Sequence, residues 1–287
     1  MTKTAPRLAV LASRVRFEEK SIMTALEQRG ADVACLDPRS LFVIGGLRWT
    51  GPEFVLNREV GHFRALYAAS ALEAAGATVL NTAAATHISG DKWHTSATLV
   101  RRGVPTPRTA LATTPEAALE ALAELGYPAV VKPLVGSWGR LVTRLPDRDT
   151  AEAVLEHIAA LPTPQAHIVY LQEQVPKADC DIRVIVVGGR ALGATYRRSA
   201  HWRTNVARGA VSEYRDLEPD HAKLAVAAAD AVGADIAGVD LIEDRDGAVT
   251  VLEVNDRVEF RGFQQAHGTR VDVAGSIADL LLARAKS

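Results

Sequence analysis

The chain has 287 residues, which is long enough for two domains or for one composite domain with a sizeable core. Hydrophobic residues make up 48% and charged residues 23%, a balance that excludes a disordered or collagen-like chain. The 33 lysines and arginines against 34 aspartates and glutamates give a net charge of −1. This charge argues against a broad basic face for nucleic acid, although one local basic loop stays possible.

Cysteine content and hydropathy narrow the class of protein further. The two cysteines, Cys35 and Cys180, are too few for a disulfide scaffold or a Cys-based zinc site. The apolar stretch near the N-terminus is too short for a secretory signal, and no stretch approaches the roughly 18 apolar residues that cross a membrane. We therefore expect a cytoplasmic protein that binds neither membranes nor nucleic acid.

The first 90 residues alternate short apolar runs with amphipathic segments that end at glycine. Buried parallel strands read as short apolar runs, and a glycine after the last periodic residue is typical of a helix end. This alternation predicts a parallel, doubly wound α/β sheet. The expected strands cover residues 7–12, 31–36, 53–58 and 77–80, and the expected helices cover residues 18–29 and 62–75.

The pattern changes after Asn81 and predicts two further parts of mixed α+β type. Apolar runs that flank Gly188-Gly189 and residues 243–247 favour two hairpins. The chain is thereby expected to divide into residues 1–90, 91–170 and 171–287. The expected helices cover residues 90–102, 114–126, 149–160, 219–232 and 274–283, and the expected strands cover residues 128–133, 141–145, 167–175, 181–187, 190–198, 237–242 and 249–254.

Three oxygen-bearing side chains interrupt the last expected hairpin. Glu253 and Asn255 are two residues apart and therefore face the same side of one strand, while Asp240 lies on its partner. Carboxylates together with phosphate oxygens are the ligands that Mg²⁺ prefers, so the group is a candidate metal site. The alternative is the solvent face of a half-exposed hairpin, which the near-continuous apolar runs disfavour.

Two lysines and a glycine loop form a second group. Lys92 is expected at a helix start, and Lys132 ends an apolar strand just before the loop. Small residues let backbone N–H groups approach phosphate oxygens, and an ammonium group neutralises their charge. Surface lysines and a simple turn are the alternatives, and the spacing differs from a Walker A motif. The loop consists of Gly136, Ser137, Trp138 and Gly139.

Arginines concentrate in residues 196–208, and Arg183 stands on a neighbouring expected strand. Arginine suits bidentate contact with carboxylate or phosphate, whereas an isolated basic loop is most often solvated. Before this run, an extended segment precedes Pro176 and offers backbone groups that can meet an adenine edge, a weak signal by itself. That segment comprises Gln172, Glu173, Gln174 and Val175.

Together these groups resemble the ATP-grasp ligases, most closely the LysX branch, with RimK as a nearby relative. The two lysines, the glycine loop, the adenine segment and the D…E-x-N residues occur in the order typical of that family. Stretches similar to LysX run along nearly the whole chain. They cover residues 14–20, 55–58, 90–93, 132–140, 199–205, 253–255 and the pair Glu259-Phe260.

The resemblance implies an ATP-grasp fold, in which two α+β lobes hold ATP behind an N-terminal Rossmann-like, pre-ATP-grasp domain. It also implies that Lys92 and Lys132 hold the phosphates, that the glycine loop closes as a lid, and that residues 172–175 meet the adenine. Asp181 is then expected near the ribose. Two Mg²⁺ ions are implied at Asp240, Glu253 and Asn255. The implied catalytic residues beside the γ-phosphate are Arg183, Arg203 and Asn205.

The implied reaction is an ADP-forming amide synthesis through an acyl phosphate. LysX-type ligases join the amino group of 2-aminoadipate to the C-terminal glutamate of a small acidic carrier protein, which a basic patch suits. The enzyme is further expected to form a dimer or tetramer. The candidate patch and substrate residues are Arg197, Arg198, His201, Trp202, Arg203, Arg208, Glu259 and Phe260.

The sequence departs from the LysX pattern immediately after the expected metal residues, where Asp256-Arg257 stands, and again over residues 261–270. This departure leaves the amino acid open between 2-aminoadipate, glutamate and an amino acid of a specialised pathway. Two alternatives therefore accompany the carrier-protein ligase. One is a ligase of free amino acids or a peptide-tailoring glutamate ligase of the RimK type, and the other is an ATP-binding module without turnover.

Overall fold

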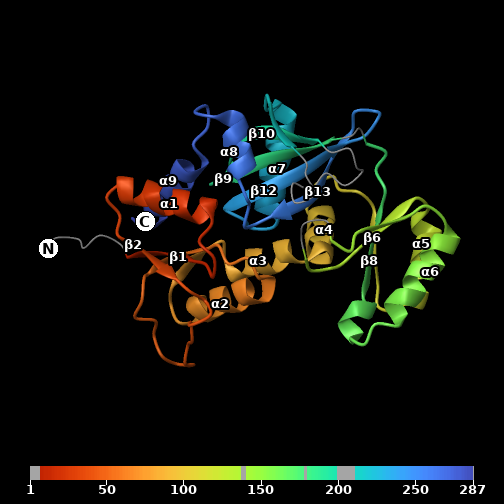
Figure 1. The fold of residues 1–287 in the computed structure, drawn as a ribbon, viewed down its shortest axis with the longest axis horizontal. Coiled ribbons are helices and arrows are strands. Elements are labelled where there is room, and N and C mark those ends of the chain that lie inside the picture. The colour runs from red at the N-terminus through yellow and green to blue at the C-terminus, as the bar shows by residue number, and fades with distance from the viewer. Residues whose placement is uncertain (1–6, 137–139, 178–179, 199–210, 287) are drawn as a thin grey trace.

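A computed structural model describes residues 7–136, 140–177, 180–198 and 211–286 (Figure 1). Its N-terminal part is a parallel four-stranded sheet in the order β2-β1-β3-β4, which confirms the predicted α/β pattern. The strands are β1 (Leu8–Leu11), β2 (Val33–Leu36), β3 (Phe54–Asn57) and β4 (Thr78–Leu80). The helices that follow them are α1 (Phe17–Gln28), α2 (His62–Ala74) and α3 (Ala83–Gly90).

The middle of the chain forms an antiparallel sheet in the order β5-β8-β6-β7. Thr114 caps the first helix of this part by accepting a hydrogen bond from the Ala117 backbone, and Pro115 follows at the first helical position. The predicted boundary at residue 170 falls inside β8, the last strand of this part. The elements are β5 (Thr109–Ala112), α5 (Pro115–Leu125), β6 (Ala129–Lys132), β7 (Thr143–Leu145), α6 (Arg148–Ala159), the 3₁₀ turn η1 (Pro164–His167) and β8 (Val169–Glu173).

The last part is a five-stranded antiparallel sheet in the order β11-β10-β9-β12-β13. Both predicted hairpins are present, β9 with β10 and β12 with β13. Helix α4 (Lys92–Arg101) supplies Leu99 to the core of this sheet, beside the alanine-rich helix α7. The elements are β9 (Cys180–Val187), β10 (Arg190–Arg198), β11 (Val211–Arg215), α7 (Pro219–Ala231), β12 (Ile236–Glu243), β13 (Val249–Asn255), α8 (Arg261–His267) and α9 (Val273–Arg284).

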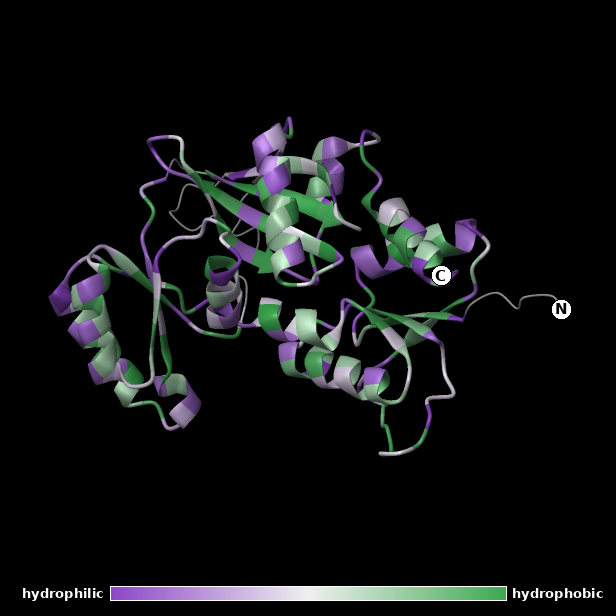
Figure 2. Cartoon of the chain, turned by 180° about the vertical axis from the view of Figure 1, so that it is seen from behind, coloured by the Kyte–Doolittle hydropathy of each residue, from purple (hydrophilic) through white to green (hydrophobic). Residues whose placement is uncertain are grey.

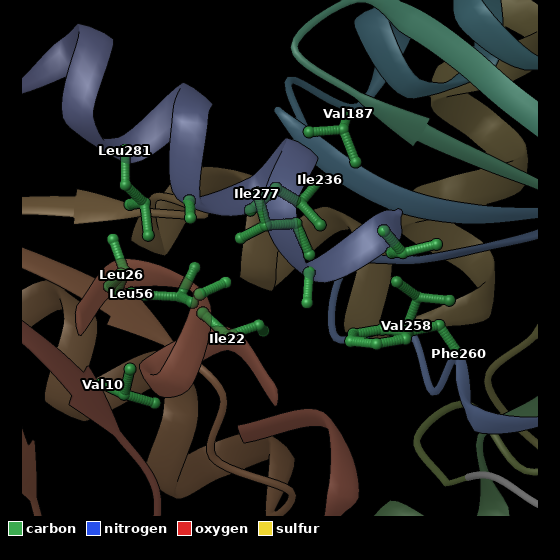
Figure 3. Packing of buried hydrophobic residues seen from close by; sticks show 14 of the residues in the cluster. Val10, Ile22, Leu26, Leu56, Val187, Ile236, Val258, Phe260, Ile277 and Leu281 are labelled. Atoms are coloured by element: carbon green, nitrogen blue, oxygen red, sulfur yellow. The ribbon is translucent and has the colours of Figure 1, made fainter. Parts of the chain in front are cut away.

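The C-terminal helix α9 packs against α1 of the N-terminal sheet, so the two ends of the chain meet (Figure 1). One apolar cluster crosses this junction and joins Val10 and Leu56 of the parallel sheet to Val187 and Phe260 of the last part (Figure 3). Figure 2 shows that the strands carry mostly apolar residues, whereas the helices turn polar residues outward. The first and last parts therefore share a core.

The structure differs from the predicted helix at residues 90–102. Gly90 ends α3, and Asp91 then caps α4 by accepting hydrogen bonds from the backbone of Trp93 and His94. A Cβ at Gly90 would lie 1.9 Å from Nδ1 of His62, so the glycine admits the imidazole ring against the backbone.

Helix α3, helix α8 and strands β5 and β11 were not predicted, because each is short and lacks a clear period.

Candidate active site

A cleft of about 1070 Å³ runs between the three parts and is lined by side chains from all of them. Among the predicted site residues that the structure describes, every one except Phe260 lines this cleft. They are Lys92, Lys132, Gly136, Gln172, Glu173, Gln174, Val175, Asp181, Arg183, Arg197, Asp240, Glu253, Asn255 and Glu259. The remaining predictions, Ser137, Trp138, Gly139, His201, Trp202, Arg203, Asn205 and Arg208, and the side chain of Arg198, fall outside the described part.

The two lysines enter the cleft from different elements. Lys132 ends β6, and its Nζ donates a hydrogen bond of 2.5 Å to Oε1 of Gln172 on the neighbouring β8. Lys92 begins α4, and its Nζ donates to the carbonyl of Gly136 at 2.8 Å. Burial lowers the pKa of Lys132 to about 8, although the carboxylate of Glu253 acts in the opposite direction. A phosphate group bound at this end of the cleft would favour the charged form of Lys132 and so oppose the effect of burial on its pKa.

Sequence reasoning placed Gln172 in the adenine segment and missed Tyr170 and Ser96, which together with Gln172 support Lys132. The amide nitrogen of Gln172 donates to the hydroxyl of Tyr170 at 3.2 Å, and this hydroxyl lies 2.8 Å from Oγ of Ser96. All three side chains are buried. The chain of contacts orients the amide so that its oxygen faces Lys132, which fixes the position of the ammonium group. The alternation of side chains along β8 could have indicated this contact, since Tyr170 and Gln172 share one face of that strand.

The predicted adenine segment spans the end of β8, an inner strand of the middle sheet, and the residues that follow it, and it lines the cleft. The backbone N–H of Glu173 donates to the carbonyl of Arg108 at 2.9 Å, and its Oε1 accepts from the Arg108 N–H at 2.7 Å. Gln174 donates from its backbone to the carbonyl of Pro128 at 3.1 Å. These bonds hold residues 173–174 in an extended conformation along the cleft.

Asp240 and Glu253 lie opposite each other in the β12–β13 ladder, and Gly238 faces Asn255 in the same register. The carboxylate of Asp240 is 3% exposed and binds two arginines. Arg183 donates to both of its oxygens, one through Nη2 at 2.9 Å, and Nη2 of Arg197 lies 2.9 Å from Oδ2. Burial alone would raise the pKa of Asp240, but the two guanidinium groups lower it below its ordinary value.

Arg197 is buried rather than placed on an open basic surface, which corrects its assignment to a patch for an acidic carrier. Its Nε donates to Oδ1 of Asp181 at 2.6 Å, and its second partner is Asp240. The guanidinium is 8% exposed. Burial lowers the pKa of Arg197, but the two carboxylates outweigh burial and raise it above its ordinary value. Asp181, predicted near the ribose, is therefore also part of this buried ion-pair network.

The oxygen donors of β13 fit a magnesium ion. Glu253 and Asn255 both line the cleft. Nδ2 of Asn255 lies 3.5 Å from the carbonyl of Gly238, which leaves Oδ1 available to coordinate a metal ion. Within the described residues, no three His, Cys, Asp or Glu side chains cluster closely enough to hold a metal by themselves. One or two carboxylates with phosphate oxygens are the usual Mg²⁺ environment, so these residues suit an ion that arrives with a nucleotide.

The N-terminal part contributes a buried ion pair beside the cleft that sequence reasoning did not single out. Nε of Arg58 lies 3.1 Å from Oε1 of Glu19, and Arg58 also donates through Nη2 to the carbonyl of Val258 at 2.9 Å. Arg16 binds Glu19 and also reaches Glu259 with Nη1. These contacts attach the segment after β13 to the first helix of the chain.

Phe260 does not line the cleft, which corrects its assignment as a substrate contact. Its side chain is fully buried, and its ring meets Phe17 edge-on at 6.1 Å between centroids. The carboxylate of Glu18 accepts the backbone N–H groups of Phe260 and Arg261, each at 3.1 Å. Phe260 therefore anchors the wall of the cleft from behind, and Glu259 on the exposed side of the same segment faces the cleft.

The residues that depart from the LysX pattern lie at this same wall. Asp256 is buried, and burial raises its pKa. Its Oδ2 lies 3.4 Å from Nη1 of Arg257, a long ion pair. His62, which lies against Gly90, also lines the cleft, and burial and the charge of Arg257 lower its pKa. This end of the cleft is built by α1, α2 and the turn after β13.

Comparison with known proteins matches both regions of the chain. The model of the RimK-like ATP-grasp domain matches residues 89–281, and that of the LysX preATP-grasp domain matches residues 8–88. The fold and the cleft therefore define an ATP-grasp enzyme. The chain belongs to the RimK-like ATP-grasp family and is an ADP-forming ligase of carbon–nitrogen bonds. Enzymes of this family use ATP and Mg²⁺.

Individual relatives match along most of their length. The glutamate–LysW ligase ArgX of Sulfolobus acidocaldarius is 33% identical over 273 residues, which cover 93% of this chain and 95% of that protein. The α-aminoadipate–LysW ligase LysX of Saccharolobus solfataricus is 32% identical over 250 residues, covering 86% and 90%. The crystal structure of a RimK domain ATP-grasp protein from Sphaerobacter thermophilus has a TM-score of 0.80 and 29% identity, covering 96% and 98%.

No helix in the part of the chain that the structure describes is long and apolar enough to cross a membrane.

Proposed function

We propose that this enzyme joins the amino group of an acidic amino acid, glutamate or 2-aminoadipate, to the C-terminal glutamate of a small acidic carrier protein of the LysW type. The observation that carries the proposal is the match to ArgX and LysX, because it spans both parts of the chain and therefore the whole cleft. The departure at Asp256-Arg257 lies in the cleft wall built by α1, α2 and the turn after β13, whereas Lys92 and Lys132 come from α4 and β6.

The lysine end of the cleft suits the phosphates of ATP. Lys92 and Lys132 approach from two elements and bring two positive charges to one region. The extended backbone of residues 173–175 runs along the same cleft and suits the adenine base. Glu253 and Asn255 would hold Mg²⁺ against the phosphate oxygens, while Asp240, whose two oxygens bind Arg183 and Arg197, would support them from behind. The bound ions would reduce the negative charge that an attacking carboxylate meets. Two ions are the number we propose.

The first chemical step activates the carboxylate of the carrier. A carboxylate oxygen attacks the γ-phosphorus of ATP, the bond to the β-phosphate oxygen breaks, and an acyl phosphate and ADP form. Arg183 lies on the floor of the cleft in contact with Asp240, which holds its guanidinium in one orientation. A preorganised cation of this kind stabilises negative charge that develops on the transferred group.

The second step forms the amide. The amine nitrogen attacks the acyl carbon, phosphate leaves, and the nitrogen loses a proton. An acyl phosphate hydrolyses in open water, so the site has to exclude solvent during this step. The proposed lid, residues 136–139, follows Lys132 directly, and Lys92 contacts its first residue, Gly136. Closure of the lid would then be coupled to phosphate binding by both lysines.

Intact-mass analysis tests the proposal. A synthetic acidic peptide that ends in glutamate is incubated with enzyme, ATP, Mg²⁺ and a panel of amino acids. We expect an ATP-dependent mass gain equal to one acidic amino-acid residue. Dipeptides among the small molecules, with the peptide unchanged, would instead identify a ligase of free amino acids. ATP binding without ADP release for any acceptor would identify a module without turnover.

Three further features complete the proposal. We propose that residues 1–90, 91–170 and 171–287 act as the N-terminal domain and the two ATP-grasp lobes, with β8 of the first lobe continuing to Glu173. A dimer or tetramer is the proposed assembly, and light scattering of the purified protein measures it. We place the reaction in the cytoplasm because it consumes ATP.

A further inference from the structure

The cleft contains several cations, and most of them already have a partner. Arg183 and Arg197 bind Asp240, and Arg16 binds Glu19 and Glu259. Lys132 donates to Gln172, and Lys92 to Gly136. The proposed function also assigns the two lysines to the phosphates of ATP and Arg183 to the transferred group. A substrate with free carboxylates therefore needs other cations on the wall.

Two arginines on the wall behind the metal residues have such capacity. Arg257 follows Asn255 by two positions, lines the cleft and is 14% exposed in its side chain. Its Nη1 is buried and, within the described residues, has no hydrogen-bond partner; its contact is the long ion pair with Asp256. Buried donors without a partner are rare in folded proteins, and a bound ligand is one of the few things that satisfy them.

Arg261 is the second arginine. It lines the same cleft and is exposed at its mouth, four residues further along the wall. Its guanidinium lies over the ring of Phe17, 5.8 Å from the centroid, and makes no ion pair within the part of the chain that the structure describes. A guanidinium that packs on an aromatic ring can still present its N–H groups to a carboxylate in a bidentate contact.

We infer that Arg257 and Arg261 form the binding site for the two carboxylates of a dicarboxylic amino acid. This inference rests on the proposed function, since it places the amine beside the acyl phosphate. The carboxylate on the α-carbon is the one nearest the reacting amine, so it binds Arg257, next to Asn255. The side-chain carboxylate extends away from the metal residues toward the seam between the N-terminal part and the last part, where it binds Arg261.

The assignment predicts that the two arginines affect amino-acid binding in different ways. Every α-amino acid carries the carboxylate that Arg257 binds, so Arg257→Gln weakens glutamate and its neutral isostere glutamine by the same factor. Arg261 contacts the group in which these two differ, so Arg261→Gln removes the preference for glutamate and leaves glutamine binding nearly unchanged. Loss of one charge-assisted bidentate contact corresponds to a factor of about 10 to 100 in affinity.

Equilibrium binding of L-glutamate, L-2-aminoadipate and L-glutamine to the full-length protein with ADP and Mg²⁺ tests the inference. Arg270→Gln is the matched control, because Arg270 also stacks on a ring, that of Tyr214, but does not line the cleft. Arg257→Lys restores a charge at the buried position and should recover part of the affinity. ADP binding and the melting temperature of each variant verify that the protein is folded.

Wild-type protein that binds no acidic amino acid, or an Arg261→Gln variant that keeps the wild-type preference, would overturn the inference. A separate reaction with the peptide, ATP and hydroxylamine reports carboxylate activation as a hydroxamate. Absence of hydroxamate together with a lost preference in Arg261→Gln removes the carrier assignment and keeps the amino-acid site. Hydroxamate formation together with an unchanged preference keeps the ligase and removes the site.

Discussion

Arg58 donates a hydrogen bond of 2.9 Å to the carbonyl of Val258, a residue 200 positions later in the chain. The guanidinium is 1% exposed and is balanced by Glu19, which is fully buried. The first helix and the wall of the cleft therefore share one buried charge network. Any change in that network should affect stability and the shape of the proposed amino-acid end of the cleft together.

The first prediction concerns Glu19→Ala. Removal of one partner of a buried ion pair leaves an uncompensated charge and typically costs about 3–5 kcal/mol of unfolding free energy. Urea denaturation measures this loss. Asp279→Ala is the control, because it breaks the exposed pair with Arg29 and should cost about 1 kcal/mol or less. Equal losses for both variants would contradict a stabilising role of the Glu19–Arg58 pair.

The same pair predicts a dependence of stability on pH. Burial alone would raise the pKa of Glu19, but the hydrogen bonds and charges of Arg16 and Arg58 lower it below its ordinary value near 4.5. A lowered folded-state pKa means that this contribution is complete above about pH 4.5 and is lost as the pH falls toward the folded pKa. Urea midpoints between pH 7 and pH 3 should fall for the wild type, and Glu19→Gln should flatten that part of the curve.

The second prediction concerns nucleotide affinity. Lys132 has a pKa of about 8 because it is buried, and only its ammonium form attracts phosphate. The dissociation constant for Mg²⁺–ADP, measured by calorimetry at constant ionic strength, should rise as the pH increases from 7.5 to 9.5. Lys132→Met should bind weakly at every pH, and the exposed Lys223→Met should behave like the wild type. A flat wild-type profile would place Lys132 outside the phosphate site.

The third prediction concerns Gly238, which faces Asn255 across the ladder. A Cβ at this position would lie 2.5 Å from Cγ2 of Val258 and 3.0 Å from Nη1 of Arg183. Gly238→Ala should therefore displace both side chains, cost about 1–3 kcal/mol of stability and lower the turnover of ATP. Gly45→Ala is the control, since nothing lies within 4 Å of its Cβ. Unchanged turnover in Gly238→Ala would show that Arg183 tolerates displacement.

The fourth prediction concerns Phe260, whose ring is buried behind the wall. Phe260→Leu conserves most of the volume and should cost no more than about 1.5 kcal/mol, seen as a lower melting temperature. The ratio of glutamate to glutamine affinity should stay at its wild-type value, because the ring does not reach the cleft. A changed ratio at an unchanged melting temperature would place the ring in contact with the substrate.

Local sequence patterns were sufficient to predict the parallel N-terminal sheet and the two hairpins. Together with the family resemblance, they also predicted site residues of which all but one in the described part line the cleft. Alternation places Glu253 and Asn255 on one face of β13, and this can be read from two positions of one strand. The register that brings Asp240 opposite Glu253 also follows from a single hairpin. Local periodicity is enough for relationships of this kind.

Relationships between distant segments could not be predicted in this way. The burial of Arg197 depends on Asp181 and Asp240, which come from two other strands, so a basic run in the sequence looked like a surface patch. The orientation of Phe260 toward the core depends on Phe17, 243 positions earlier in the chain. Neither contact leaves a periodic signal in the sequence.

The seam where α1 meets the turn after β13 has a consequence for protein engineering. The proposed amino-acid end of the cleft is assembled from two short segments that are far apart in the sequence, one around Arg16-Phe17-Glu18-Glu19 and one around residues 256–261. A substitution that removes a charge from one of them leaves the facing charge of the other without its partner across the seam. Under this proposal, a change in amino-acid specificity requires that both segments be exchanged together.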